Sequence, residues 1–384
     1  MIDVAIVGGG PSGLALAILL LESGHRVKVL ESRTAIGGHS RAIGIHPPGL
    51  AVLDRLGVGA DAAARGVRIG HGVGISRGRI VAELSFASIA AEHRFVLSLP
   101  QNDTVSLLRA RLRSLDPGAL ATGTAFTAFE QHDGQVLAHT RDTDGKVRML
   151  RCRFLVGADG TRSDVRRVAG VPLSGRRLPD TYLMGDFPES TEFGSIAALF
   201  LHGHGITESF PLPGNMRRWV CWIRESETAS LPELIVRRTG QTVDGDRTSM
   251  LSRFTTANLA VRSMDPGGVL LIGDAAHEVS PIGGQGITLG LLDAAGLAGI
   301  LDAALGGGLS GTGLRKELDA FSRIRLAAAR RAAVQAHVNM ALGRPLWRPA
   351  TGVRDALARA LLASDRFSAV VASAFTMTRG EGGR

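Results

Sequence analysis

Two glycine-rich segments of the sequence could each hold part of a phosphate-containing cofactor. The first is GGGPSG (8–13), after the β-branched run 2–7, and the second is GDAAHEVSPIGGQG (273–286), after the apolar run 269–272. In both, a strand pattern leads through glycines into a helix pattern, and the N–H groups of a helix N-terminus bind anions. Such a pair could hold two ligands or the two ends of one.

The first segment has the spacing of a dinucleotide-binding loop. Gly8, Gly10 and Gly13 form G-x-G-x-x-G, in which the glycines permit a tight turn, close approach of a pyrophosphate, and close packing of helix on strand. Glu31 ends the second strand, where its carboxylate would accept hydrogen bonds from ribose hydroxyls. An acid there favours FAD or NAD over NADP in this site. The neighbouring candidates are Pro11, Ser12, Ser32 and Arg33.

The second segment has the residues to hold the far end of the same molecule. Asp274 follows a strand and could accept hydrogen bonds from a ribitol, which FAD has and nicotinamide dinucleotides lack. The helix that begins near its last glycines would direct its positive end at a flavin ring, and would stabilise the anionic reduced form. We therefore expect one FAD to be bound by both segments. The candidate residues here are Gly273, Asp274, Pro281, Gly284, Gln285, Gly286, Ile287 and Thr288.

The elements that would position these residues indicate an α/β fold. A βαβ unit is expected over 2–31, helices over 48–56 and 104–115, and hairpins between 124 and 157 with turns at Asp133-Gly134 and Asp144-Gly145. Residues 171–265 are mainly strand-like, and the chain after 290 is mostly helical. We expect a Rossmann-like FAD-binding domain with an interleaved, mostly antiparallel β substrate domain and C-terminal helices. The FAD-binding domain takes residues 1–67, 100–170 and 266–330, the substrate domain 68–99 and 171–265, and the C-terminal helical segment 331–384.

Composition argues against several other classes of protein. The net charge is +9 and the pI about 10.8, but the basic residues are dispersed and nearly all Arg, and only one Tyr and three Trp could stack on bases, so no nucleic-acid partner is expected. The apolar run 14–24 is too short to span a bilayer. No signal peptide is evident, and we expect a cytoplasmic protein without stable membrane insertion. His202 and His204 lack acidic or cysteine partners in the sequence, so no metal is expected.

Three motifs in order resemble one known family. They are GGGPSG with Glu31, GADGTRSDVRR (157–167) and GDAAHEVSPIGGQG, and together they make the chain similar to the group A FAD-dependent aromatic hydroxylases, the monooxygenases related to para-hydroxybenzoate hydroxylase. The resemblance implies FAD contacts at Arg41, Gln101 and Arg109, and at the pair Asp159 and Gly160, which is also linked to NAD(P)H binding.

The resemblance also implies the chemistry. NADPH or NADH would reduce the flavin as a transient electron donor, O2 would add to form a flavin C4a-hydroperoxide, and the distal oxygen would pass to a small aromatic or polyketide-like substrate. Pro281 resembles the family residue on the oxygen-reactive face of the flavin. The chain departs from the family at Ser280-Pro281, where paired prolines are common, and at Ile287-Thr288, where Met-Asn or Leu-Asn is usual. A monomer or homodimer is expected.

The residues that touch the substrate are less well defined by the sequence. Tyr182, the one tyrosine, is a candidate substrate contact, with a structural role as the alternative. The stretch RRWVCWIRE (217–225) resembles a motif of flavin-dependent halogenases but lacks its proline, and alternating sheet packing is the better account of it. The alternative functions are a flavin-dependent reductase of the geranylgeranyl-reductase type, such a halogenase, or a non-catalytic flavin-binding protein.

Overall fold

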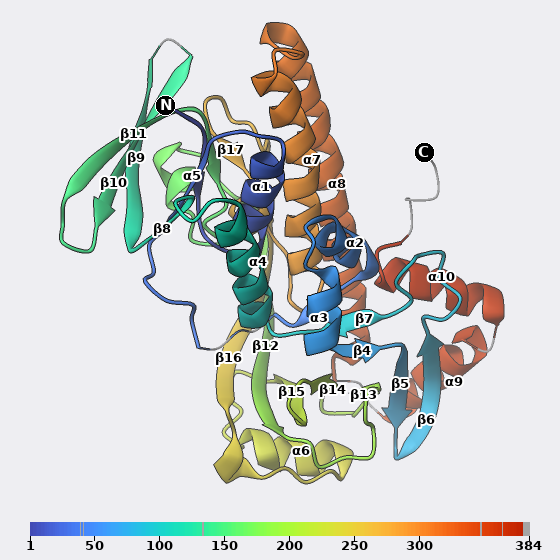
Figure 1. The fold of residues 1–384 in the computed structure, drawn as a ribbon. Helices are drawn as coiled ribbons and strands as arrows, with labels where there is room; N and C mark the ends of the chain where they lie inside the picture. Colours follow the sequence, from blue (N-terminus) through green and yellow to red (C-terminus); the bar gives the residue numbers. More distant parts are fainter. Residues whose placement is uncertain (39, 41, 133, 346–347, 363, 379–384) are drawn as a thin grey trace.

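The described strands form three sheets, and the two longest helices, α7 (Gly286–Leu305) and α8 (Gly311–Gly343), lie side by side (Figure 1). The computed structural model describes residues 1–38, 40, 42–132, 134–345, 348–362 and 364–378. The α/β fold expected from the sequence is confirmed.

The first sheet, sheet A, is built around the N-terminal strand. Its order is β8 (Leu120–Thr122), β2 (Val27–Glu31), β1 (Ile2–Val7), β11 (Val147–Gly157), β10 (Gln135–Asp142) and β9 (Thr124–His132), with β17 (Leu270–Leu271) paired to β11. The strands β8, β2, β1, β11 and β17 run parallel, whereas β9, β10 and β11 form an antiparallel meander. The expected βαβ unit and hairpins are therefore present. The parallel arrangement places the chain after β1, β2, β11 and β17 at one edge of the sheet.

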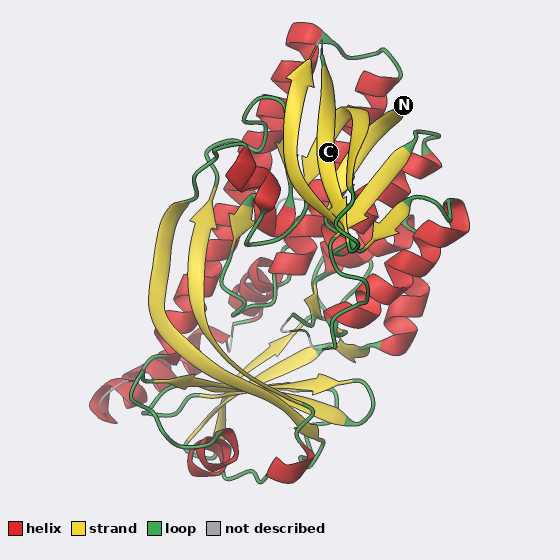
Figure 2. Ribbon diagram, turned by 90° about the vertical axis from the view of Figure 1, so that its left-hand side faces the viewer, coloured by secondary structure: helices red, strands yellow, loops and turns green. Residues whose placement is uncertain are grey.

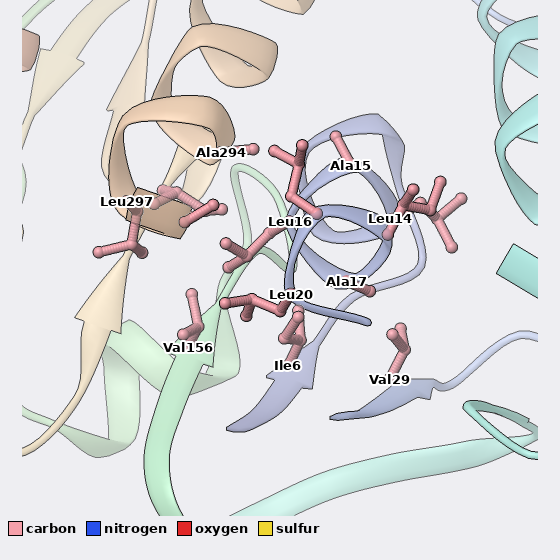
Figure 3. Close-up of a cluster of buried hydrophobic side chains, with 14 of the residues drawn as sticks. Ile6, Leu14, Ala15, Leu16, Ala17, Leu20, Val29, Val156, Ala294 and Leu297 are labelled. Carbon is pink, nitrogen blue, oxygen red and sulfur yellow. The ribbon is translucent and has the colours of Figure 1, made fainter. Parts of the chain in front are cut away.

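Helix α1 (Pro11–Glu22) lies between sheet A and α7 (Gly286–Leu305). Figure 3 shows Leu16 and Leu20 of α1 between Ile6 and Val156 of sheet A and Leu297 of α7. Helix α7 is long and apolar enough to cross a membrane, but 61% of its apolar window is buried inside the protein. That burial, against α1 and α8 (Gly311–Gly343), is the property of a core helix. Helix α2 (Pro47–Arg55) packs against α7, α3 (Gly59–Arg65) against α2 and α4 (Gln101–Leu115), α4 against α1, and α5 (Asp164–Val168) against β9 and β11.

The large sheet, sheet C, is mostly antiparallel, as expected for the second domain. Its order is β18 (His277–Glu278), β16 (Met250–Ala260), β12 (Ser174–Pro188), β15 (Met216–Ile223), β14 (Thr207–Leu212), β13 (Ala197–Phe200), β5 (His71–Ser76) and β6 (Arg79–Ser85). Only the pairing of β13 with β5 is parallel among these described strands. Figure 2 shows two long strands, β12 and β16, running from beside sheet A into this sheet.

Residues 171–265, which we expected to be mainly strand, also contain a helix. Helix α6 (Leu231–Thr239) begins at a capping box in which the side chain of Ser230 accepts the N–H of Glu233 and the side chain of Glu233 accepts the N–H of Ser230. It ends at Gly240, whose φ of 73° is left-handed. A short 3-10 turn, η1 (Gly245–Arg247), follows.

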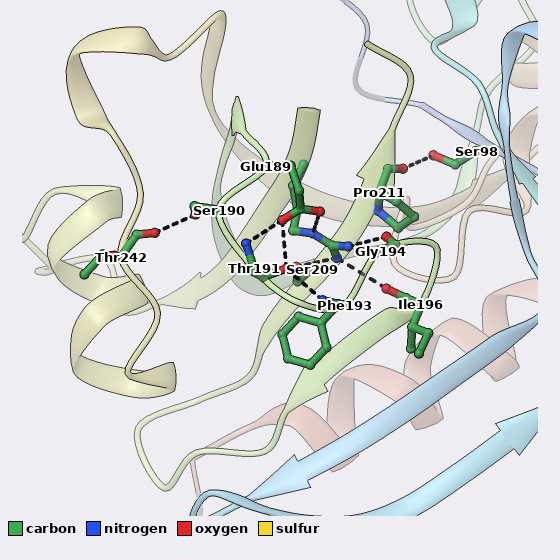
Figure 4. A network of polar contacts seen from close by, with 11 residues as sticks. Ser98, Glu189, Ser190, Thr191, Phe193, Gly194, Ile196, Ser209, Pro211 and Thr242 are labelled. Atoms are coloured by element: carbon green, nitrogen blue, oxygen red, sulfur yellow. Dashed lines mark hydrogen bonds and ion pairs between the residues drawn. The ribbon is translucent and has the colours of Figure 1, made fainter. Parts of the chain in front are cut away.

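A small third sheet lies beside sheet C, and the C-terminal helices pack against sheet C as well. Sheet B contains β3 (Gly44–Ile45), β7 (Val96–Ser98) and β4 (Val67–Ile69), and the Ser98 hydroxyl donates to the Pro211 carbonyl of sheet C over 2.6 Å (Figure 4). The same figure shows a polar network among Glu189, Thr191 and the carbonyls of Gly194 and Ile196, which Arg217 links. Helix α8 runs unbroken through residue 330, and α9 (Arg348–Leu362) and α10 (Asp365–Phe375) pack against β6.

Candidate cofactor and substrate site

A cavity of about 1040 Å³ extends from the edge of sheet A to one face of sheet C. It is at the upper end of the range for sites of small molecules and cofactors. The expected residues that line it are Gly8, Gly10, Pro11, Ser12, Glu31, Ser32, Arg33, Gln101, Arg109, Asp159, Gly160, Asp274, Pro281, Gly284, Gly286 and Ile287. Gly13, Gly273, Gln285, Thr288 and Tyr182 are not among its lining residues, and Arg41 lies outside the described residues.

The first glycine loop presents bare backbone and an acid to this cavity. A Cβ on Gly13 would lie 2.1 Å from the Gly8 carbonyl oxygen, so helix and loop can pack this closely only with glycine there, whereas a Cβ on Gly10 would meet nothing within 4 Å. The carboxylate of Glu31 accepts the Gly9 N–H and the Arg33 N–H, both at 2.9 Å. Burial alone would raise the pKa of Glu31, but these N–H groups outweigh it and lower the pKa. Oε1 also accepts the Arg33 Nε–H at 3.3 Å, so the further acceptor position is on Oε2.

The second glycine loop lies directly on the first. Gly273 has a φ of 60°, and a Cβ there would lie 2.7 Å from the Ser12 hydroxyl oxygen, so the two loops are in contact. The side chain of Asp274 opens into the cavity, and within the described part of the chain no group donates a hydrogen bond to it. Desolvation raises the pKa of Asp274. The negative charges of Glu278 and Asp293 raise it further, whereas His277 lowers it.

A buried charge cluster fixes the second loop to the start of α7. Asp293 accepts the Gly273 N–H at 2.9 Å, His277 Nε2 at 2.6 Å and Arg325 Nε at 2.6 Å. Desolvation opposes its ionisation, but His277 and Arg325 lower the pKa of Asp293 to about 2. The pKa of His277 is raised, because the attraction of Asp293 exceeds the cost of burial. The carboxylate of Asp293 on α7 thus links the second glycine loop to α8.

His46 is a cavity residue that sequence reasoning missed. Its backbone N–H donates to Thr288 Oγ1 at 3.0 Å, and its Nε2 lies 2.9 Å from the Gly283 carbonyl, which can only accept, so Nε2 carries the proton. Burial lowers the pKa of His46 to about 4, so the ring is neutral at pH 7. The signal in the sequence is the His-Pro-Pro start of α2. The residue ties that helix to the glycines 283–284, more than 230 positions later.

The middle motif connects the two loops. Ala158 follows β11 beside Gly8, and Arg166 donates to the carbonyls of Ala275 at 2.8 Å and Thr161 at 2.7 Å. Asp159 accepts the Asp164 N–H with Oδ2 at 2.7 Å, while its other oxygen is buried without a partner in the described structure. Desolvation raises the pKa of Asp159. An unpartnered buried acceptor in a cavity wall is a place where a bound molecule would donate.

On the side of sheet C most of the residues that line the cavity are apolar. Tyr182 stacks on Phe254 with ring centroids 5.6 Å apart, and its hydroxyl is buried, so it lies behind the wall. Trp219 and Trp222 belong to sheet packing: Trp219 stacks on Phe200, and Trp222 donates to Asp180. Strands β12 to β16 of sheet C contribute Met184, Ala197, Leu199, Glu208, Phe210, Arg218, Val220, Phe254 and Thr255 to the wall. Sequence reasoning missed Glu208, although the alternation in ITESFPL (206–212) places it on the face of Ile206 and Phe210.

The lining residues fit the two ends of an FAD. Two helix N-termini, of α1 and α7, open on the cavity with glycines before them, and Glu31 and Asp274 offer carboxylates beside each. Asp159 adds a buried oxygen with no partner in the described part of the chain.

Comparisons with known proteins agree with that fit. The family described as FAD binding domain matches residues 1–336. The para-nitrophenol 4-monooxygenase of Pseudomonas sp. (strain WBC-3) is 31% identical over 344 residues, covering 83% of this chain and 81% of the relative. The 12-dehydrotetracycline 5-monooxygenase/anhydrotetracycline 6-monooxygenase of Streptomyces rimosus is 32% identical over 79% of this chain, which spans 63% of that relative.

Solved structures give the same result for the fold. The p-nitrophenol 4-monooxygenase PnpA from Pseudomonas putida DLL-E4 superposes with a TM-score of 0.88, covering 98% of both chains at 24% identity. The OxyS anhydrotetracycline hydroxylase from Streptomyces rimosus superposes with a TM-score of 0.81 at 27% identity, covering 98% of this chain and 76% of that one.

Proposed function

Because the chain belongs to the FAD-dependent aromatic monooxygenases, we propose that it uses NADPH or NADH and O2 to hydroxylate an aromatic or polyketide-like small molecule. The observation that carries the proposal is the cavity itself, which reaches from the two glycine loops to an apolar face of sheet C. A cofactor and a flat substrate can lie in it together.

We assign the two ends of the cavity to the two ends of FAD. Glu31 would accept hydrogen bonds from the adenosine ribose, the N-terminus of α1 at Gly10 would face the pyrophosphate, and Asp274 would accept from the ribitol. The N-terminus of α7 and the segment from Pro281 to Gly284 would lie along the ring. When bound, FAD would supply hydride acceptance from NAD(P)H and O2 activation through the C4a-hydroperoxide implied by the family resemblance.

The protein's part is to bind, orient and exclude water. Ile282, in the loop after Pro281, packs in one buried cluster with apolar residues of sheet C. These include Met184, Val220 and Phe254. Water excluded from that cluster cannot divert reactive oxygen to hydrogen peroxide. Nitrophenols and polycyclic phenols are the substrates to try first, since the named relatives are monooxygenases of para-nitrophenol and of 12-dehydrotetracycline and anhydrotetracycline.

The test combines spectroscopy with isotope labelling. We expect the purified protein to be yellow or to become so with added FAD, and to oxidise NADPH faster with a phenol present. Labelled oxygen from O2 should appear in the product. A reductase would oxidise NADPH and reduce its substrate without incorporating the label. Protein that stays colourless in excess FAD would overturn the proposal.

A further inference from the structure

Glu208 is a carboxylate of the cavity wall that has no partner in the described structure. Glu208 lies on β14 with only 6% of its surface exposed, and its side chain lines the cavity. Within the described part of the chain it forms no hydrogen bond and no ion pair. Buried carboxylates are normally paired or hydrogen-bonded, because desolvation of an unpaired charge is costly. An unpaired carboxylate at the surface of a cavity therefore suggests that a bound ligand supplies its hydrogen-bond donor.

The nearest neighbours of Glu208 on sheet C are apolar. Its cross-strand neighbours are Leu199 on β13 and Val220 on β15, and Ile206 and Phe210 flank it on the same face of β14. Several of these side chains belong to the buried cluster that also contains Ile282. Glu208 therefore lies in the part of the cavity that the loop after Pro281 closes.

Two cations of the cavity wall, Arg218 and Arg354, form their contacts with other groups. Arg218 forms an ion pair with Asp186 at 2.7 Å and donates to the Ser40 carbonyl. Arg354 of α9 contacts Asp355 and the Leu201 carbonyl. Neither contact places a positive charge on the Glu208 carboxylate.

Burial raises the pKa of Glu208 to about 7. The titratable groups that interact with it electrostatically are Tyr182 on β12 and Cys221 on β15, both with pKa values raised by burial, so they stay neutral when Glu208 ionises. A base with a pKa near the working pH transfers protons most effectively.

We propose that Glu208 is the catalytic base of this chain, accepting the proton of the hydroxyl group of a neutral phenol bound on the apolar face of sheet C. This inference rests on the proposed function. The O–H bond of the phenol breaks, the proton passes to the carboxylate, and the electron pair left on oxygen enriches the ring for attack on electrophilic oxygen. The C–H proton of the hydroxylated ring then passes to solvent water as the ring becomes aromatic again, and Glu208 returns its own proton to the ring oxygen, which regenerates the carboxylate.

The assignment also defines a substrate class. A phenol donates to the carboxylate, whereas an aromatic acid would bring a second negative charge into the same apolar surroundings. We therefore expect neutral phenols to be accepted and aromatic acids with their carboxylate at this end of the cavity to be rejected.

The test compares Glu208→Gln with wild type on para-substituted phenols that differ in the acidity of their hydroxyl. The amide keeps the shape but cannot take a proton. With FAD content unchanged, product formation from weakly acidic phenols should fall about 100-fold. Phenols acidic enough to ionise in solution should lose far less. The wild-type rate should rise with pH through about 7, and Glu208→Gln should lack that rise.

Two further variants complete the experiment. Glu208→Asp should keep the pH dependence at a reduced rate, because a carboxylate remains. Glu317→Gln, at an exposed position of α8, should match wild type throughout. An equal loss for all phenols, or an unchanged pH profile in Glu208→Gln, would overturn the role of Glu208 and leave the proposed function standing. If wild type hydroxylates none of the phenols, both fail.

Discussion

At the scale of residues, three carboxylates in one cavity wall differ through what surrounds them. Glu31 accepts two backbone N–H groups and has a lowered pKa, whereas Asp274 and Glu208 have no hydrogen-bond partner in the described structure and have raised pKa values. The surroundings of Glu31 stabilise its ionised form, whereas a ligand that donates hydrogen bonds would stabilise the ionised forms of Asp274 and Glu208.

Removing the carboxylate of Asp274 should weaken FAD binding. A hydrogen bond to a charged group contributes roughly 1.5–3 kcal/mol, so Asp274→Ala should raise the Kd for FAD about 10-fold or more. The measurement is quenching of flavin fluorescence as apoprotein is titrated with FAD. Asp302→Ala, at an exposed ion pair on α7, is the matched control and should bind like wild type. Equal Kd values for all three proteins would remove the role assigned to Asp274.

The raised pKa of Glu208 should also appear in stability. Its folded-state pKa of about 7 exceeds the usual 4.5, so its contribution is fully present below about pH 4.5 and is lost as pH rises through 7. Relative to Glu208→Gln, wild type should lose about 3 kcal/mol between these limits. Urea denaturation midpoints of the two proteins across this pH range give the comparison. Midpoints that change in parallel with pH would contradict the shift.

At the scale of elements, the N-terminus of α7 depends on a charge cluster that only the folded chain assembles. Asp293 joins the Gly273 loop, His277 and Arg325 of α8. Truncating one member of a buried charge cluster leaves the others unpaired in a medium that solvates them poorly.

Asp293→Ala should destabilise the protein by about 3–5 kcal/mol, because His277 and Arg325 then lose their anion. Asp302→Ala, also on α7 but at the surface, should cost about 1 kcal/mol or less. Chemical denaturation at pH 7 measures both. Comparable losses in the two variants would show that the buried cluster contributes no more than a surface pair.

Local sequence patterns predicted the helices and strands better than they predicted the contacts between distant residues. The βαβ unit, the hairpins, α4 and the start of α7 follow from glycine spacing, turn dipeptides and apolar periodicity. Helix α6 was missed although Ser230, Glu233 and Gly240 carry its start and stop signals, because the surrounding alternation suggested strands. Contacts such as His46 with Gly283 join residues distant in sequence, and no local pattern encodes them. Glu208 was missed because what distinguishes it is that its carboxylate has no partner in the described structure. The sequence does not show which groups surround a side chain in the folded protein.

At the scale of the whole molecule, the C-terminal helices close the cavity. Phe375 of α10 lines it, stacks on Phe86 with ring centroids 5.8 Å apart, and contacts the edge of His46 at 5.6 Å. Gln285 donates to the Phe375 carbonyl at 3.3 Å. The last described helix is therefore in contact with the second glycine loop.

Phe375→Ala should admit water and uncouple the reaction. We expect NADPH oxidation to continue while a larger share of the reducing equivalents appears as hydrogen peroxide. Peroxide and hydroxylated product are measured together against NADPH consumed. Phe367→Ala, at a more exposed position of α10, is the control and should stay coupled like wild type. If Phe375→Ala keeps its product yield per NADPH, α10 does not protect the site.

The parallel strands at the centre of sheet A come from distant parts of the chain: β1 pairs with β11, and β11 with β17. During synthesis on the ribosome, β1 therefore emerges long before either later strand, and the sheet is complete only after residue 271 has been made. By then every strand of sheet C except the short β18 has also emerged. We therefore expect sheet A to form late in synthesis, when the strands of sheet C other than β18 are already available to fold.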